Sequence, residues 1–270
     1  MRRLGFFLAL LAGVLLPSLL VFPREIRLPA EGNLYGNVVI AEWFYRTERV
    51  QGTEVTTPRS FPLWPQGGGG KTADWLDGRI EASPGDVILL APGAYSVQLW
   101  VFTPDVTITT DPSSQALATI QGTLEIDADG VTVDRIAVAG PHTVGTSPSG
   151  HGIELNQKLL SRVAIRNCQI TGNPWTGIHI VGTGGEMAEI KVEDCAITGN
   201  GQDGLDAQNV ALLVITGCTI TGNGATNSGG VGVRLGHGIG EVILERTTVA
   251  GNRKADVCSA DGKWGPRCNP

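Results

Sequence analysis

Apolar and polar residues alternate with a period of two in short segments that recur through the second half of the chain. Each segment runs into a motif of the form CxITGN. The copies are CQITGN at 168, CAITGN at 195 and CTITGN at 218, with degenerate copies IAVAGP at 136 and TTVAGN at 247. The residues five and three positions before each motif are apolar as well, as Val163 and Ile165 are before Cys168. This pattern predicts strands with one buried face, in coils joined by turns of variable length.

A third apolar segment follows each motif after a turn. The copies are GIELN at 152, GIHIV at 177, GLDAQ at 204, GVRLG at 232 and ADVCS at 255. Strands this short cannot bury their apolar faces alone, but stacked coils can. The sequence therefore predicts an all-β solenoid, a parallel β-helix in which each strand pairs with its counterpart one coil away, at about 4.8 Å.

The stretch SPGDVILLAPGAY at 83–95, the VTITT that follows it and the coils that end in GN resemble the right-handed parallel β-helix proteins of the pectin lyase-like superfamily. The resemblance covers about residues 72–257 and implies one β-helix domain of about six coils. That superfamily includes polysaccharide lyases, hydrolases, epimerases, adhesins and periplasmic accessory proteins. It therefore implies a fold more strongly than an activity.

The N-terminal segments do not show the coil pattern. Residues 1–22 combine a basic start with an apolar run from Leu4, which predicts a cleaved export signal or an uncleaved membrane anchor. Either one predicts a secreted, periplasmic or envelope-attached protein. Residues 23–71 are expected to form an extension and a glycine-rich linker, and a short helix over residues 73–82 is expected to cap the open end of the stack.

The five cysteines fall into two groups. Cys258 and Cys268 bracket the C-terminal cap loop, residues 258–270, and a disulfide could close it in an oxidising compartment. The other three begin the repeat motifs and are predicted to form a buried stack of free thiols: Cys168, Cys195 and Cys218. A metal site is the weaker interpretation of that stack, because no histidine or carboxylate shares its face.

The asparagines that end the motifs recur at one turn of the coil: Asn173, Asn200, Asn223 and Asn252. They are predicted to form a turn ladder, because asparagine tolerates a left-handed backbone and can bond to its counterpart in the next coil. Asp203 is predicted to be a turn residue of the same region, and at most a ligand at the edge of a groove.

Alternation in the third strand predicts one outward row of side chains: Glu154, His179, Asp206, Arg234 and Asp256, extended backwards by Glu125 and Trp100. In the proteins that this fold resembles, the same sheet floors the substrate groove. The long turn over residues 139–151, with His142 and His151, is expected to lie beside the row.

Glu154, His179, Asp206 and Arg234 are the candidate catalytic residues. Glu154 and Asp206 are two coils apart, about 9.6 Å, near the upper end of the separation of roughly 6.5 to 9.5 Å in inverting glycosidases. His179 between them suits a general acid or an electrostatic stabiliser. Trp100, Glu125, Trp175 and Asp256 are candidate substrate-binding residues, since tryptophan can stack on sugar faces.

Elimination from a uronate is the other candidate reaction, and the arginine of the row together with potential calcium ligands favours it over hydrolysis. Arg234 resembles the arginine base of calcium-dependent pectate lyases, and Glu154 and Asp206, with Glu125, could hold calcium. The paired-aspartate segment of polygalacturonases and the DPHD segment of alginate epimerases are both missing from the sequence.

Charge compensation is an alternative explanation of the row, because like charges on paired strands are destabilising and alternating signs avoid that. Under this alternative the protein is a non-catalytic structural or adhesion module of the cell surface or envelope. The net charge of −6 without a basic run argues against a nucleic-acid partner. A polysaccharide is the expected partner, and the chain is expected to be a monomer.

Overall fold

The computed structural model describes residues 25–28, 36–41, 45–50, 53–58, 78–140, 150–156, 159–183, 185–225 and 229–268. The predicted signal or anchor and the glycine-rich linker lie outside these ranges, as does His142. Among the described residues, none belongs to a helix long and apolar enough to span a membrane.

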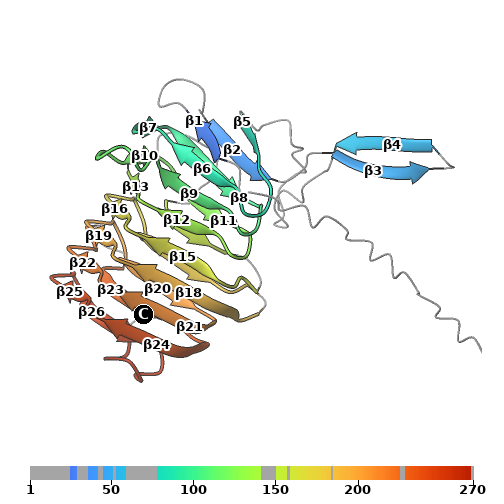
Figure 1. Ribbon diagram of the computed structural model, residues 1–270. Coiled ribbons are helices and arrows are strands. Elements are labelled where there is room, and N and C mark those ends of the chain that lie inside the picture. The colour runs from blue at the N-terminus through green and yellow to red at the C-terminus, as the bar shows by residue number, and fades with distance from the viewer. Residues whose placement is uncertain are drawn as a thin grey trace, which may run out of the picture.

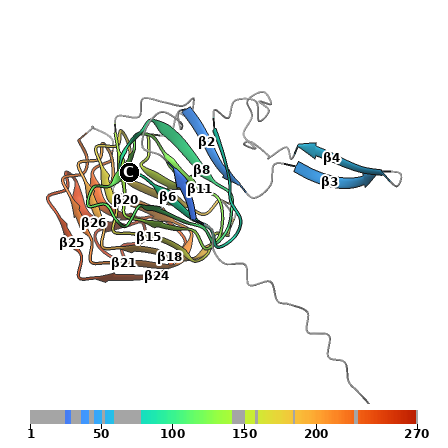
Figure 2. The ribbon, with the colours of Figure 1, turned by 45° about the horizontal axis from the view of Figure 1, so that its top comes forward.

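Three parallel sheets wind around one core (Figures 1 and 2). The first contains, in spatial order, β1 (Glu25–Leu28), β6 (Val87–Leu90), β9 (Thr107–Thr110), β12 (Thr132–Asp134), β15 (Val163–Arg166), β18 (Met187–Glu193), β21 (Val210–Thr216) and β24 (Ile239–Glu245). The second contains β25 (Thr248–Ala250), β22 (Thr219–Thr221), β19 (Ala196–Thr198), β16 (Gln169–Thr171), β13 (Ile136–Ala139), β10 (Ala118–Ile120) and β7 (Gly93–Tyr95).

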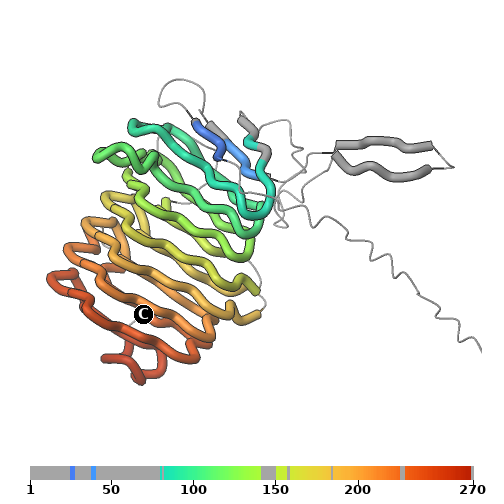
Figure 3. Tube along the Cα trace, viewed as in Figure 1, coloured from blue at the N-terminus to red at the C-terminus, as the bar shows by residue number. Residues whose placement is uncertain are grey.

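The third sheet carries the predicted row. It contains β26 (Ala255–Ser259), β23 (Val231–Leu235), β20 (Leu205–Gln208), β17 (Ile178–Val181), β14 (Ile153–Leu155), β11 (Leu124–Ile126), β8 (Val97–Val101), β2 (Gly36–Ala41) and β5 (Gly78–Glu81). From β6 onwards, consecutive strands occupy the three sheets in turn, so the chain advances one coil at a time toward the C-terminal end (Figure 3). This confirms the predicted parallel solenoid of about six coils, and β6–β8 and β9–β11 form two coils ahead of the five that the motifs mark.

The N-terminal region contributes strands that the repeat pattern did not reveal. β1 pairs in parallel with β6, and β2 pairs in parallel with both β8 and β5. The helix expected over residues 73–82 is wrong where the structure describes it, because Gly78–Glu81 form β5 at the edge of the third sheet. β3 (Tyr45–Val50) and β4 (Thr53–Pro58) form a separate antiparallel pair.

The alternating apolar residues fill the core as predicted. Val163, Ile165 and their counterparts in the neighbouring coils are fully buried. Leu244 belongs to β24 at the edge of the first sheet, where no described strand covers it, and is 41% exposed. The three motif cysteines are buried free thiols that form no disulfide. Each Sγ donates a hydrogen bond to the backbone carbonyl oxygen of the residue two positions earlier in the chain. Hydrogen bonding to the neighbouring cysteine side chain, followed by burial, raises the pKa of the Cys195 and Cys218 thiols, so this stack is an apolar part of the core.

The motif asparagines form the expected ladder. Both the backbone amide and Nδ2 of Asn173 donate to Oδ1 of Asn200, at 3.1 and 2.9 Å, and Asn200 donates in the same way to Asn223. The expected reason was partly wrong: the left-handed residue is the glycine before each asparagine, with φ of +65° at Gly172 and Gly199. The asparagine side chain therefore serves to join coils rather than to turn the chain.

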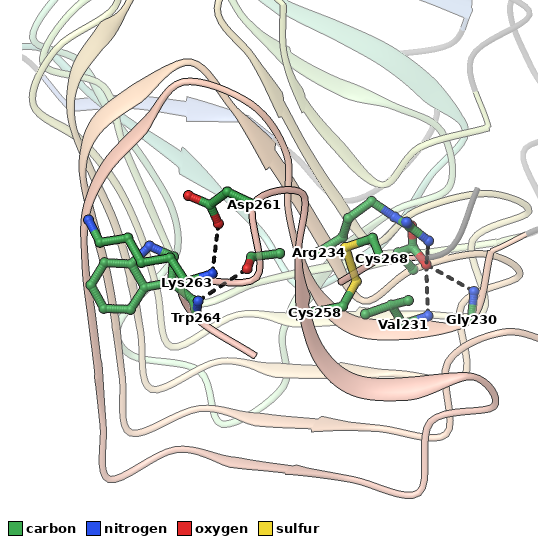
Figure 4. Close-up of a disulfide and its surroundings, with 10 residues drawn as sticks. Gly230, Val231, Arg234, Cys258, Asp261, Lys263, Trp264 and Cys268 are labelled. Atoms are coloured by element: carbon green, nitrogen blue, oxygen red, sulfur yellow. Dashed lines mark hydrogen bonds and ion pairs between the residues drawn. A yellow bond between two sulfur atoms is a disulfide. The ribbon is translucent and has the colours of Figure 1, made fainter. Parts of the chain in front are cut away.

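A loop closed by the Cys258–Cys268 disulfide follows the last strand (Figure 4). Within it, the backbone amide of Trp264 donates to Oγ of Ser259, and the Trp264 ring packs against the core cluster. This loop covers part of the C-terminal end of the stack.

Candidate functional site

Six consecutive strands of the third sheet carry the predicted row in register. Trp100 on β8 pairs with Glu125 on β11, Glu125 with Glu154 on β14, and Glu154 with His179 on β17. The row then continues through Asp206 on β20 to Arg234 on β23. Period-two alternation therefore placed these side chains correctly, because every strand of this sheet pairs without a register shift over that span.

Asp256 does not belong to the row, and its predicted place is wrong. Arg234 is in register with Cys258, so Asp256 lies two residues before the row on β26. Its Oδ1 instead accepts hydrogen bonds from the backbone amide and Nδ2 of Asn252, at 3.3 and 3.2 Å. Asp256 thus ends the asparagine ladder, taking the place that a further motif asparagine would hold.

The acids of the row differ in exposure. Glu125 is only 2% exposed and Glu154 is 6% exposed, whereas the side chains of His179 and Asp206 retain 20% and 13% of their surface. A side chain that points outward from a strand can still be shielded from solvent, because large neighbouring side chains along the row cover one another. Of the candidate catalytic residues, His179, Asp206 and Arg234, whose side chain is 21% exposed, are therefore the ones that can meet a ligand.

Burial changes the charge of Glu125. Desolvation, followed by repulsion from Asp127 and Glu154, raises the pKa of the Glu125 carboxyl to about 8, although the Trp100 indole N–H donates to its Oε2 and opposes the shift. Glu125 is therefore a neutral acid at pH 7. Of the predicted substrate-binding residues, Trp100 lies beside Glu125 through this bond, and its ring is only partly exposed.

A histidine pair lies at the centre of the row. The rings of His151 and His179 stack with centroids 4.2 Å apart and an angle of 4° between their planes. Trp175, which is 38% exposed, packs edge-on against His151 at 5.2 Å. On the other side of His179, its Nδ1 lies 3.6 Å from Oδ2 of Asp206. The turn before β14 and the strands β17 and β20 thus meet at one place.

One group with metal-ligand spacing occurs among the described residues, and it lies here. His151, Glu154 and His179 each offer a donor atom within 4.8 Å of the others. Glu154 was a predicted metal ligand, whereas Asp206, the other predicted ligand, is not part of this group. The sequence carried a signal for it, because His151 and Glu154 are three residues apart in HGIE, but His151 was placed only in the wall of the groove.

The Arg234 guanidinium forms an ion pair with Asp203. Its Nε donates to Oδ2 of Asp203 at 2.7 Å and its terminal nitrogen to Oδ1 at 3.3 Å. The same Oδ1 accepts the backbone amides of Gly230 and Val231 (Figure 4). The bond to Asp203 raises the pKa of the Arg234 guanidinium further. Asp203 is therefore a buried anchor between coils rather than a simple turn residue.

This pairing matters for the candidate reactions. A guanidinium whose pKa is raised by a bidentate carboxylate is a poor proton acceptor. The geometry therefore removes one of the two reasons for ranking elimination ahead of hydrolysis, namely Arg234 as its base; the other reason is the predicted calcium.

The comparisons with known proteins agree with the coil architecture. The family model described as the right-handed beta helix region matches residues 151–263. The chain is a right-handed parallel β-helix protein. The matched region of this β-helix protein includes His151, Glu154, His179, Asp206 and Arg234. The pectin lyase-like superfamily is consistent with this fold. Neither the curated proteins nor the solved structures contain a match to the chain.

Proposed function

We propose that this β-helix protein binds a polysaccharide along its third sheet and hydrolyses it at the centre of the row. The observation that carries the proposal is the unbroken register of Glu154, His179 and Asp206 on neighbouring strands, with the partly exposed Trp175 ring beside them. A row at one residue per coil repeats about every 4.8 Å, which matches an extended chain ligand better than a compact one. An indole face supplies a platform for a sugar ring.

Hydrolysis is the reaction that the side chains support best. Water attacks the anomeric carbon, the glycosidic oxygen leaves with a proton, and the attacking water gives up a proton. His179 and Asp206, in contact at 3.6 Å and both partly exposed, are the groups placed to carry these two protons. Arg234, already held by Asp203, is suited to binding an oxygen of the substrate and not to removing a proton from it.

Export is part of the proposal. The basic start and apolar run of residues 1–22 support it, and so does the disulfide between Cys258 and Cys268, because structural disulfides persist in oxidising compartments.

A panel of neutral and acidic polysaccharides tests the proposal, with reducing ends and unsaturated products followed in parallel. We expect new reducing ends without unsaturated product from at least one glycan. Asp206→Asn should lower the rate about 100-fold or more, as loss of a group that transfers protons does. Glu189→Gln on the first sheet, which replaces a carboxylate paired with Lys191, is the matched control and should retain full activity.

Two outcomes would overturn the proposal. Unsaturated product would mean elimination and would restore Arg234 as a candidate base. No product from any glycan, together with an unchanged melting temperature in the presence of each one, would instead favour a structural or adhesion module.

A further inference from the structure

The side chains at the centre of the row have a donor set that a sugar site does not require. His151 precedes β14, Glu154 lies within it, and His179 is the in-register partner of Glu154 on β17. Their donor atoms lie within 4.8 Å of one another, and His151 and Glu154 are buried. Two imidazoles and one carboxylate thus converge from two neighbouring coils.

The surroundings hold the rings in place. The His151 ring stacks on the His179 ring and makes a T-shaped contact with the Trp175 indole, so two neighbouring rings restrict its movement. The Nδ1 of His179 is buried and has no hydrogen-bond partner among the described residues, and the nearest acidic group is Asp206 at 3.6 Å. With Nδ1 turned toward Asp206, Nε2 is the nitrogen left to face a ligand. A carboxylate behind a ligating histidine is a common second partner in metal sites.

We propose that His151, Glu154 and His179 bind one divalent transition-metal ion of the zinc, cobalt or nickel type. Neutral imidazole nitrogen together with carboxylate oxygen suits these ions, and three protein ligands leave positions for water or a substrate oxygen. Metal–ligand bonds of about 2.0 to 2.2 Å place neighbouring donors roughly 3 to 3.5 Å apart, so donor atoms that lie as much as 4.8 Å apart must approach by roughly 1.3 to 1.8 Å.

Calcium does not fit this donor set. It takes 6–8 oxygen ligands and has little affinity for imidazole, whereas two of the three groups here are nitrogen donors. The calcium predicted for Glu154 and Asp206 remains untested, and the arrangement of the side chains favours a different metal on Glu154.

The metal site does not depend on the proposed polysaccharide activity. An ion at this place would have Glu154 as a ligand and would leave Asp206, the neighbour of His179, outside the coordination shell. Proton transfer by Asp206 is therefore compatible with a bound metal, whereas His179 cannot hold the metal and carry a proton at the same time, so its part in the proposed hydrolysis applies to the metal-free protein. Binding is measured without any glycan, so the two proposals can fail separately.

The test uses the full chain without a histidine tag, stripped with a chelator and titrated with Zn²⁺, Co²⁺ and Ca²⁺ by calorimetry and thermal unfolding. We expect saturation at one Zn²⁺ per chain and a melting temperature higher by about 5 °C or more at a hundredfold excess over the dissociation constant. Co²⁺ should give visible absorption bands that Zn²⁺ abolishes. Ca²⁺ should give a shift no larger than the buffer control.

Three variants probe the ligands: His151→Ala, Glu154→Gln and His179→Ala. Each is expected to weaken Zn²⁺ binding at least tenfold and to remove the cobalt bands. His237→Ala is the matched control, because His237 is exposed on the turn after β23, away from this cluster, and should leave binding unchanged. Circular dichroism and melting in chelator establish that each variant folds, and Glu154→Gln preserves side-chain size.

The proposal is overturned if Zn²⁺ shows no saturable binding to the folded wild-type chain. It is also overturned if His237→Ala loses binding as much as His151→Ala and His179→Ala do, or if Ca²⁺ binds more tightly than Zn²⁺. In those cases the stacked histidines are only packing partners of Trp175.

Discussion

Asn200→Ala is expected to lower the free energy of unfolding by about 4 kcal/mol, because several buried groups lose their partners at once. The Asn200 side chain is fully buried. Its Oδ1 accepts two hydrogen bonds from Asn173, and its Nδ2 donates to Oδ1 of Asn223 and to the carbonyl oxygen of Ile170, at 2.9 and 3.2 Å. Alanine leaves these groups buried and supplies no polar atom in place of the amide.

Denaturant unfolding followed by circular dichroism measures this effect. Thr198→Ala, two residues earlier on β19, is the matched control. Among the described residues its hydroxyl makes one long hydrogen bond, of 3.4 Å to Oγ1 of Thr171, so the expected loss is below about 1 kcal/mol. Equal losses in the two variants would show that the asparagine ladder does not join the coils as described.

Glu125→Gln is expected to remove most of a pH dependence of stability that the wild-type chain shows between about pH 4.5 and 8. The pKa of Glu125 rises on folding from 4.5 to about 8, so in this range the folded chain holds a proton that the unfolded chain releases. The contribution to stability is complete below pH 4.5 and is lost as the pH rises through 8. Over that range the free energy of unfolding should fall by roughly 3 to 5 kcal/mol in the wild type relative to the variant.

The measurement is a set of denaturant curves from pH 4 to 9 in the presence of a chelator, so that no metal ion contributes. Above pH 8 the glutamine variant should be the more stable protein, since its amide needs no charge in the buried site and can still accept the Trp100 indole N–H. Glu189→Gln should follow the wild-type curve. A glutamine variant whose stability falls as steeply as the wild type's would mean that Glu125 is already ionised at neutral pH.

Most of the fold could be predicted from the sequence because each coil repeats the same pattern of buried apolar positions. Apolar residues such as Val163 and Ile165 face inward in every complete coil, and register from one coil to the next follows from the repeat itself. The N-terminal strands β1 and β2 carry no motif, and their pairing depends on long-range contacts with β6 and β8. For the same reason, residues 78–81 were misassigned to a helix.

Only the order of the site residues along the row could be predicted from the sequence. Alternation placed Glu154, His179 and Asp206 in line, but it could not show which of them are covered. Burial depends on neighbours from other coils and turns, as for Glu125 beneath Trp100. The row ended at Arg234 because the last strand pairs two residues out of the expected register.

Alternation along the strands also could not predict two contacts, because in each of them one residue lies in a turn and the other lies in a strand of a different coil. Asp203 holds Arg234 from 31 residues away. His151 stacks on His179 from the turn before β14.

The central claim is that the row is a ligand site and not a charge-compensated surface. The stability of Asp206→Asn relative to Asp203→Asn in metal-free protein at pH 7 tests it most directly. Asp203, with four hydrogen bonds to its carboxylate, is structural, so Asp203→Asn should cost about 3 kcal/mol or more. Asp206 lies 3.6 Å from His179 and has a charge interaction with Arg234, whose guanidinium is already paired with Asp203, so Asp206→Asn should change stability by less than about 1 kcal/mol, as expected for a residue kept for function. A loss from Asp206→Asn as large as that from Asp203→Asn would contradict the claim, because it would show that Asp206 balances charge in the fold.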